Sequence, residues 1–184
     1  RIAAGAALGP HVITLDGADG PSNSRLFNVT QFPLVVENEP NDVAAKAQAI
    51  KLEPQSIQGY MKGEPDVDLF AFTARAGERW SFDVRSLEYG THLESSLTLL
   101  DAAGRRVTLN EDRDDYDESP FLEHTFGDAG RYILKLDQYR GPQGVNCAQN
   151  CGYSLEISRL PRLTGISPLG TRPGETVKFT LSGT

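Results

Sequence analysis

The stretch Arg79-Trp-Ser-Phe-Asp-Val-Arg85 decides the fold, because its apolar and polar residues alternate strictly. Trp80, Phe82 and Val84 fall on one side of an extended chain, while the hydroxyl and charged side chains fall on the other. A period of two is typical of a strand with one buried face and one solvated face. The sequence therefore predicts a half-buried β-strand at this position.

The same alternation recurs in other short segments. Residues 131–137 and 153–158 alternate in this way, although Ile133 interrupts the polar side of the first. Further candidate strands are 56–61, 67–73, 95–100 and 121–126. Turn signals rich in Gly, Pro and Asp separate these segments, and only residues 41–49 carry a helical indication, as a short Ala-rich turn. About seven short strands at this spacing predict an all-β, antiparallel β-sandwich.

The two ends of the chain do not belong to this set of strands. Residues 1–33 and 161–184 each carry strand-like pieces separated by turns, and an isolated piece of sheet cannot satisfy its own backbone. We therefore expect a complete central domain at 34–160, preceded by the closing strands of one small β domain and followed by the opening strands of another. Such end strands are also able to pair head to tail between copies of the chain.

The composition excludes two classes of partner. The chain has 184 residues, with 18 Lys+Arg against 25 Asp+Glu and a net charge of −7. A surface that binds nucleic acid needs clustered basic residues, so we expect no nucleic-acid partner. No apolar run approaches the ~18 residues of a membrane span, so we expect no membrane insertion.

Two acidic groups flank the first predicted core strands. The segment Glu37-Asn-Glu39-Pro-Asn41-Asp42 is rich in oxygen ligands, and a second acidic group, Glu64-Pro-Asp66-Val-Asp68, precedes an aromatic strand. Hard oxygen donors suit Ca²⁺, which accepts six to eight of them. If the groups meet, a cation between them relieves the repulsion among the carboxylates. The alternative is a set of solvated loop acids.

A second candidate acidic site lies at 110–118, which holds six acids and one arginine. Its alternating oxygens, among them Asp112, Asp114 and Asp117, are similar to a calcium loop, but the Gly and the distant Glu of an EF-hand are absent. A solvated loop between two strands is the other interpretation.

The cysteines Cys147 and Cys151 lie four residues apart, with no histidine near them in the sequence. A local disulfide is favoured over a metal site or free thiols, and a disulfide is typical of an exported protein.

The motifs resemble the bacterial pre-peptidase C-terminal (PPC) domain across the whole central segment. The resemblance is carried by Glu-x-Glu-Pro-Asn-Asp at 37–42, by Asp-x-Asp-Leu-Phe-x-Phe at 66–72, and by Leu97–Gly104, Ala129–Tyr132 and Tyr153–Ile157. It implies a jelly-roll-like β-sandwich attached to secreted peptidases and other exported proteins. In the similar domains of bacterial collagenases, the acidic linker and the Asp pair bind calcium and the domain binds collagen.

Carried over residue by residue, the resemblance implies a Ca²⁺ cofactor and a defined ligand set. The implied ligands are Glu37, Glu39, Asn41, Asp42, Asp66 and Asp68. The flanks 22–29 and 168–177 resemble pieces of immunoglobulin-like domains, as found beside such modules in large exported proteins of planctomycete type.

No catalytic motif is assembled by the sequence. It contains no Gly-x-Ser-x-Gly, no His-Glu-x-x-His and no phosphate-binding glycine loop. We therefore expect a non-enzymatic, calcium-binding module, secreted, at the cell surface or in the periplasm. It would bind a matrix protein, a polysaccharide or a neighbouring domain. Alternatively, the module is a structural spacer in which calcium stiffens the linker between tandem domains.

Overall fold

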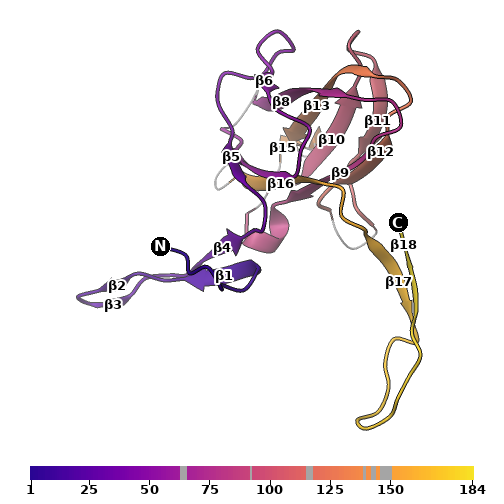
Figure 1. Cartoon of the computed structure of the whole chain (residues 1–184). Helices are drawn as coiled ribbons and strands as arrows, with labels where there is room; N and C mark the ends of the chain where they lie inside the picture. The colour runs from indigo at the N-terminus through magenta and orange to yellow at the C-terminus, as the bar shows by residue number, and fades with distance from the viewer. Residues whose placement is uncertain (63–65, 92, 115–117, 139, 142–143, 146–150) are drawn as a thin grey trace.

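Two five-stranded sheets packed face to face form the body of the protein in a computed structural model (Figure 1). The structure describes residues 1–184 except 63–65, 92, 115–117, 139, 142–143 and 146–150. The predicted all-β sandwich is confirmed. In the part of the chain that the structure describes, the helical structure is a single 3₁₀ turn, η1 (Leu87–Tyr89), and no helix has the length and hydropathy of a membrane span.

The first sheet has the strand order β11-β10-β13-β8-β6. Its strands are β6 (Gln48–Ala49), β8 (Val67–Ala74), β10 (Ser95–Leu100), β11 (Arg106–Asn110) and β13 (Gly130–Gln138). Neighbours pair antiparallel except at one edge, where β6 runs parallel to β8.

The second sheet has the order β12-β9-β16-β7-β5. Its strands are β5 (Leu34–Val36), β7 (Gln55–Tyr60), β9 (Arg79–Arg85), β12 (Phe121–Thr125) and β16 (Gly152–Ser158). Here β5 pairs parallel to β7, whereas the other pairs are antiparallel. The predicted antiparallel pairing therefore holds throughout the sandwich except at the β5 and β6 edges, where the acidic linker carries the chain from one sheet to the other.

The core lies between the sheets and consists of the inward-facing residues, which alternate with outward-facing ones along each strand. Trp80, Phe82 and Val84 of β9 are all buried, as their spacing predicts. Phe72 stacks on Phe82 across the core, with 5.7 Å between ring centroids. Residues 41–49, in contrast, form one hydrogen-bonded turn and then enter β6 rather than forming a helix, because so short a segment cannot repay the cost of helix nucleation.

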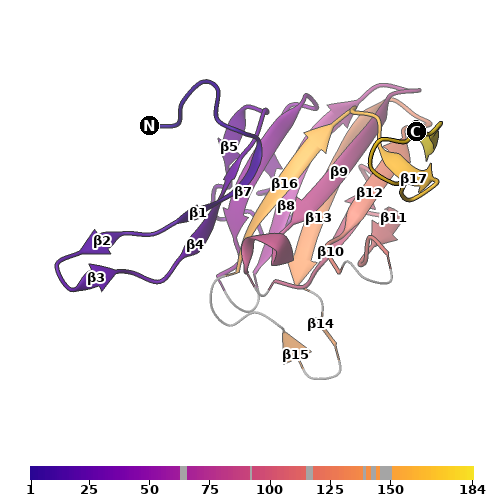
Figure 2. The same cartoon turned by 90° about the horizontal axis from the view of Figure 1, so that it is seen from below.

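Three small hairpins stand outside the two sheets (Figures 1 and 2). The N-terminal arm pairs β1 (Gly9–Ile13) with β4 (Arg25–Val29) and ends in β2 (Asp16–Gly17) and β3 (Gly20–Pro21). The C-terminal hairpin pairs β17 (Leu163–Ser167) with β18 (Thr180–Gly183), and β14 (Arg140–Gly141) pairs with β15 (Gly144–Val145). The assignment of the first two hairpins to immunoglobulin-like domains remains a prediction.

The edge strand β5 is tied to the opposite sheet by one side chain. Gln48 of β6 donates from Nε2 to the Val36 carbonyl at 3.1 Å, and its Oε1 accepts from the Asn38 amide at 2.8 Å. This contact holds the chain at the point where it leaves β5 and enters the acidic linker.

Candidate metal centre

The predicted ligands come from two segments that meet at one end of the sandwich. Glu37 directly follows β5, and its amide continues the pairing with β7 by donating to the Gln58 carbonyl at 2.9 Å. Asp68 is the second residue of β8 and shares the inward face with Phe70 and Phe72, so it is fully buried. The same alternation that builds the core therefore turns a carboxylate inward beside the linker.

The structure brings all six predicted residues together, and we call them the linker cluster: Glu37, Glu39, Asn41, Asp42, Asp66 and Asp68. One carboxylate oxygen each from Glu37, Glu39 and Asp68 lies within 4.8 Å of the other two. A second such group is formed by Glu39, Asp42 and Asp66. Glu39 belongs to both groups, so it joins them into one site.

Asn41 is completely buried between the two groups. One end of its side-chain amide lies 3.2 Å from Asp68 Oδ1 and 3.1 Å from Glu39 Oε2. With Nδ2 at this end, the amide donates to both carboxylates, and with Oδ1 at this end, three oxygens converge on one point. The second arrangement offers oxygen ligands to a cation. The amide therefore fits the cluster both with and without a bound ion.

Two buried carboxylate oxygens of the cluster have no hydrogen-bond partner among the residues that the structure describes. These are Glu37 Oε1 and Asp66 Oδ1. Asp66 as a whole residue is 8% exposed. Leaving a charged oxygen unpaired and out of water costs free energy. Glu37 belongs to one group of candidate ligands and Asp66 to the other, and unpaired carboxylate oxygens in such groups fit a hard divalent cation.

Asp68 is held by Tyr153 of β16. The tyrosine hydroxyl donates to Asp68 Oδ2 at 2.5 Å, across the space between the sheets. The ring reaches Asp68 by lying over Gly59 of β7, where a Cβ atom would come within 2.2 Å of the tyrosine Cζ. Gly59 therefore leaves the space that lets Tyr153 orient this carboxylate.

The electrostatics of the cluster reflect crowded acids in a buried place. Burial raises the pKa of Asp68 from 3.8 to about 7, and the charges of Glu37 and Asp66 also raise it. The hydrogen bond from Tyr153 acts in the opposite direction and lowers this pKa. Burial likewise raises the pKa of Glu37 and of Asp66. Burial, followed by the charge of Asp68, raises the pKa of Tyr153 well above its usual range, so its hydroxyl remains a donor.

Lys62 lies at the rim of the cluster and contacts it twice. Its ammonium Nζ pairs with Glu39 Oε1 at 3.1 Å, while its backbone amide donates to Asp66 Oδ2. The other oxygen of Glu39 accepts the backbone N–H of Asn41 at 3.0 Å.

The sequence analysis did not identify Lys62, Tyr153 and Gly59 as parts of the site. A glycine inside the strand pattern of 56–61 was the available signal, because it suggests a close approach.

The second acidic site has a different arrangement, and we call residues 110–118 the acidic loop. Asp112 and Asp114 are exposed, whereas Asp117 lies outside the described residues. Arg113 points back to the sheet, where it pairs with Asp83. Burial raises the pKa of Glu94, and the charges of Glu118, Asp112 and Glu111 add to this. Within the described part of the chain, the groups of acids that could hold a metal ion all belong to the linker cluster.

The cysteines can be placed only in part. Cys151 is buried and disulfide-bonded, and its carbonyl accepts the Met61 amide N–H at 3.1 Å. Cys147 lies outside the described residues, so the pairing of the two remains a prediction.

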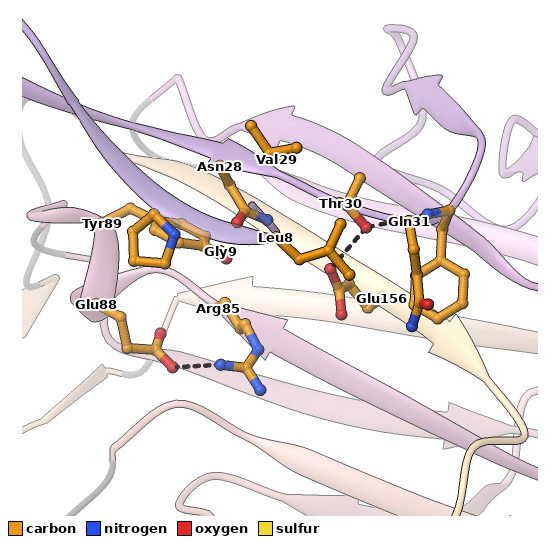
Figure 3. A pocket seen from close by; sticks show the side chains of 12 residues that line it. Leu8, Gly9, Asn28, Val29, Thr30, Gln31, Arg85, Glu88, Tyr89 and Glu156 are labelled. Carbon is orange, nitrogen blue, oxygen red and sulfur yellow. Dashed lines mark hydrogen bonds and ion pairs between the residues drawn. The ribbon is translucent and has the colours of Figure 1, made fainter. Parts of the chain in front are cut away.

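A cleft of about 390 Å³, lined by both apolar and polar residues, lies between the N-terminal arm and the second sheet (Figure 3). Thr30 crosses it, donating from Oγ1 to Glu156 Oε1 at 3.1 Å, and Arg85 pairs with Glu88 at 3.3 Å on the sheet side. None of the predicted metal ligands lines this cleft. The cleft lies where the N-terminal arm joins the second sheet, and it is separate from the linker cluster.

Comparison with curated proteins finds a relative of part of the chain, although no protein-family model matches. Over 81 residues the chain is 38% identical to a probable subtilase-type serine protease of Deinococcus radiodurans. The match spans 43% of this chain but only 11% of that relative's length.

Similar solved structures include the pre-peptidase C-terminal domain of a collagenase from Bacillus anthracis. That match has a TM-score of 0.47 at 16% identity and covers 66% of this chain and 99% of the other. A periplasmic inhibitor of g-type lysozyme from Aeromonas hydrophila follows, with a TM-score of 0.44, 14% identity and coverage of 61% and 96%. A PPC domain, the family that the motifs resemble, is therefore among the similar solved structures.

Proposed function

We propose that this chain is a calcium-binding β-sandwich module that works without catalysis in an exported protein. The observation that carries the proposal is the linker cluster, in which five carboxylates and one buried amide converge. Two of its buried oxygens have no hydrogen-bond partner within the described part of the chain. Ca²⁺ accepts carboxylate and amide oxygens and tolerates irregular geometry. When bound, it would neutralise the crowded acids and fix the linker to β8.

Export and the absence of catalysis are supported by separate observations. Cys151 is disulfide-bonded, which suits an oxidising compartment. Similar solved structures include a PPC domain and a periplasmic lysozyme inhibitor. In this setting we propose that the module binds a matrix protein, a polysaccharide or a neighbouring domain, and that it binds neither nucleic acid nor the interior of a membrane.

Thermal unfolding tests the metal claim directly. A ligand that binds only the folded state raises the melting temperature by mass action. We expect millimolar Ca²⁺ to raise the melting temperature by several degrees over EGTA, and Mg²⁺ to raise it less, because Mg²⁺ demands stricter octahedral geometry. Equal melting temperatures in EGTA and Ca²⁺ would contradict the proposal.

A second candidate function is that of a spacer whose joint is set by calcium. The path from the arm to the cluster favours it: Thr30 is tied to Glu156, the Pro33 carbonyl accepts from the Ser56 amide at 2.9 Å, and β5 then pairs with β7. The next residues along the chain are the ligands. The linker is therefore held at both ends, and a bound ion would fix the direction in which the arm leaves the sandwich.

A binding assay separates the two functions. Arrays of glycans and matrix proteins are probed with the full chain in Ca²⁺ and in EGTA. Calcium-dependent capture supports the binding module. Calcium stabilisation without capture of any probe supports the spacer.

A further inference from the structure

We propose that Lys62 is a built-in competitor that sets the calcium affinity of the linker cluster. This inference rests on the proposed function. Its ammonium occupies Glu39 Oε1 at 3.1 Å, and Glu39 is the residue common to both groups of candidate ligands. A cation that binds at Glu39 must therefore meet a positive charge already in place.

The charge of Lys62 reaches beyond Glu39. It acts on Glu37 and on Asp66 as a favourable cation, and these residues come from the linker and from the segment before β8. The ammonium thus stabilises the calcium-free cluster by standing in for part of the charge that a metal ion would supply.

The geometry makes the side chain dispensable for the fold but not for the affinity. The Lys62 side chain is 60% exposed, so replacing it removes little packing from the fold. The contact with Asp66 is made by the backbone amide, which a side-chain substitution leaves in place. Removing the charge therefore removes the competitor without removing a ligand.

The expected effect follows from Coulomb's law. At a separation of about 6 Å in water, the repulsion between a divalent ion and an ammonium amounts to about tenfold in affinity. Lys62→Gln should therefore bind Ca²⁺ about tenfold more tightly than the wild type. A residue that positioned ligands would show the opposite sign, because its loss would weaken binding.

The test is calorimetric titration of the full chain with Ca²⁺ at low salt. Lys62→Gln is compared with the wild type, with Lys62→Arg, which keeps the charge, and with Lys178→Gln, which removes an exposed lysine from the loop between β17 and β18. We expect tighter binding from Lys62→Gln alone. The gain should shrink to about twofold in 1 M salt, where charges are screened within about 3 Å.

The outcomes are distinguishable. Calcium binding with an equal or weaker affinity in Lys62→Gln overturns the competitor role and leaves the proposed function standing. A gain of the same size in Lys178→Gln also overturns it, because net charge would then be the cause. Absence of calcium binding in the wild type overturns the proposed function, and the competitor role with it.

Discussion

The linker cluster and the acidic loop are both dense in acids, yet the fold treats them in opposite ways. In the linker cluster, residues some 30 positions apart meet at the end of the sandwich, and Asp68 is fully buried. In the acidic loop, Asp112 and Asp114 remain exposed to water. Local acid content therefore does not predict whether carboxylates converge and become buried. Four predictions test this contrast.

The largest expected effect is that of Asp68→Asn on calcium affinity. This change keeps the shape of the side chain but removes a buried ligand charge from one group of the cluster. We expect calcium binding to weaken about a hundredfold or more, measured by calorimetric titration. An effect below threefold would place the ion elsewhere.

The second prediction concerns pH in the absence of calcium. The pKa of Asp68 is about 7 in the folded chain against an ordinary value of 3.8, so the folded state holds this proton more tightly than the unfolded state. Stability should therefore fall as pH rises from about 4 to 7 and level off above. We expect the melting temperature in EGTA to drop by about 5 °C across this window. Asp68→Asn should remove most of the drop, and an unchanged drop in that variant would contradict the assignment.

The third prediction concerns the support of Asp68. Tyr153→Phe removes the hydroxyl that donates to Asp68 Oδ2 and leaves the ring over Gly59. Loss of an orienting partner typically costs ten- to a hundredfold in metal affinity, and we expect about tenfold here. The measurement is the same titration, with near-ultraviolet circular dichroism to verify that the core remains packed. Unaltered affinity would show that Tyr153 serves packing alone.

The smallest effect should come from the acidic loop. Asp112→Asn removes the same charge as Asp68→Asn but from an exposed position. We expect a change in calcium affinity below twofold, since exposed charges are screened and contribute little. Equal losses in Asp112→Asn and Asp68→Asn would reverse the contrast between the two regions.

Most of the sandwich could be predicted from alternation. The expected strand 95–100 coincides with β10, and 79–85 coincides with β9. The strand β11 was not predicted, because Val107 and Leu109 are about 40% exposed at a sheet edge and mark no buried face. The parallel pairing of β5 with β7 also escaped prediction, since side-chain alternation carries no information about strand direction.

Only the acidic residues of the candidate site and Asn41 could be predicted from the sequence. Its acids stand out as a motif, whereas Tyr153 looks like any other inward residue of a strand. Its role depends on a glycine in the neighbouring strand and an aspartate in the opposite sheet. Such a role arises from contacts between sheets, which no local pattern reports. Lys62 was missed because its partner Glu39 lies 23 residues away, beyond the reach of a local pattern.

The side-chain amide of Gln48 has a consequence for how copies of this module coexist. An exposed edge strand invites another chain to add to the sheet, which is a common route to aggregation. Here Gln48 bonds the Val36 carbonyl and the Asn38 amide, the groups that an incoming strand would use. Gln48 thereby blocks strand addition at the end of the β5 edge that leads into the linker cluster.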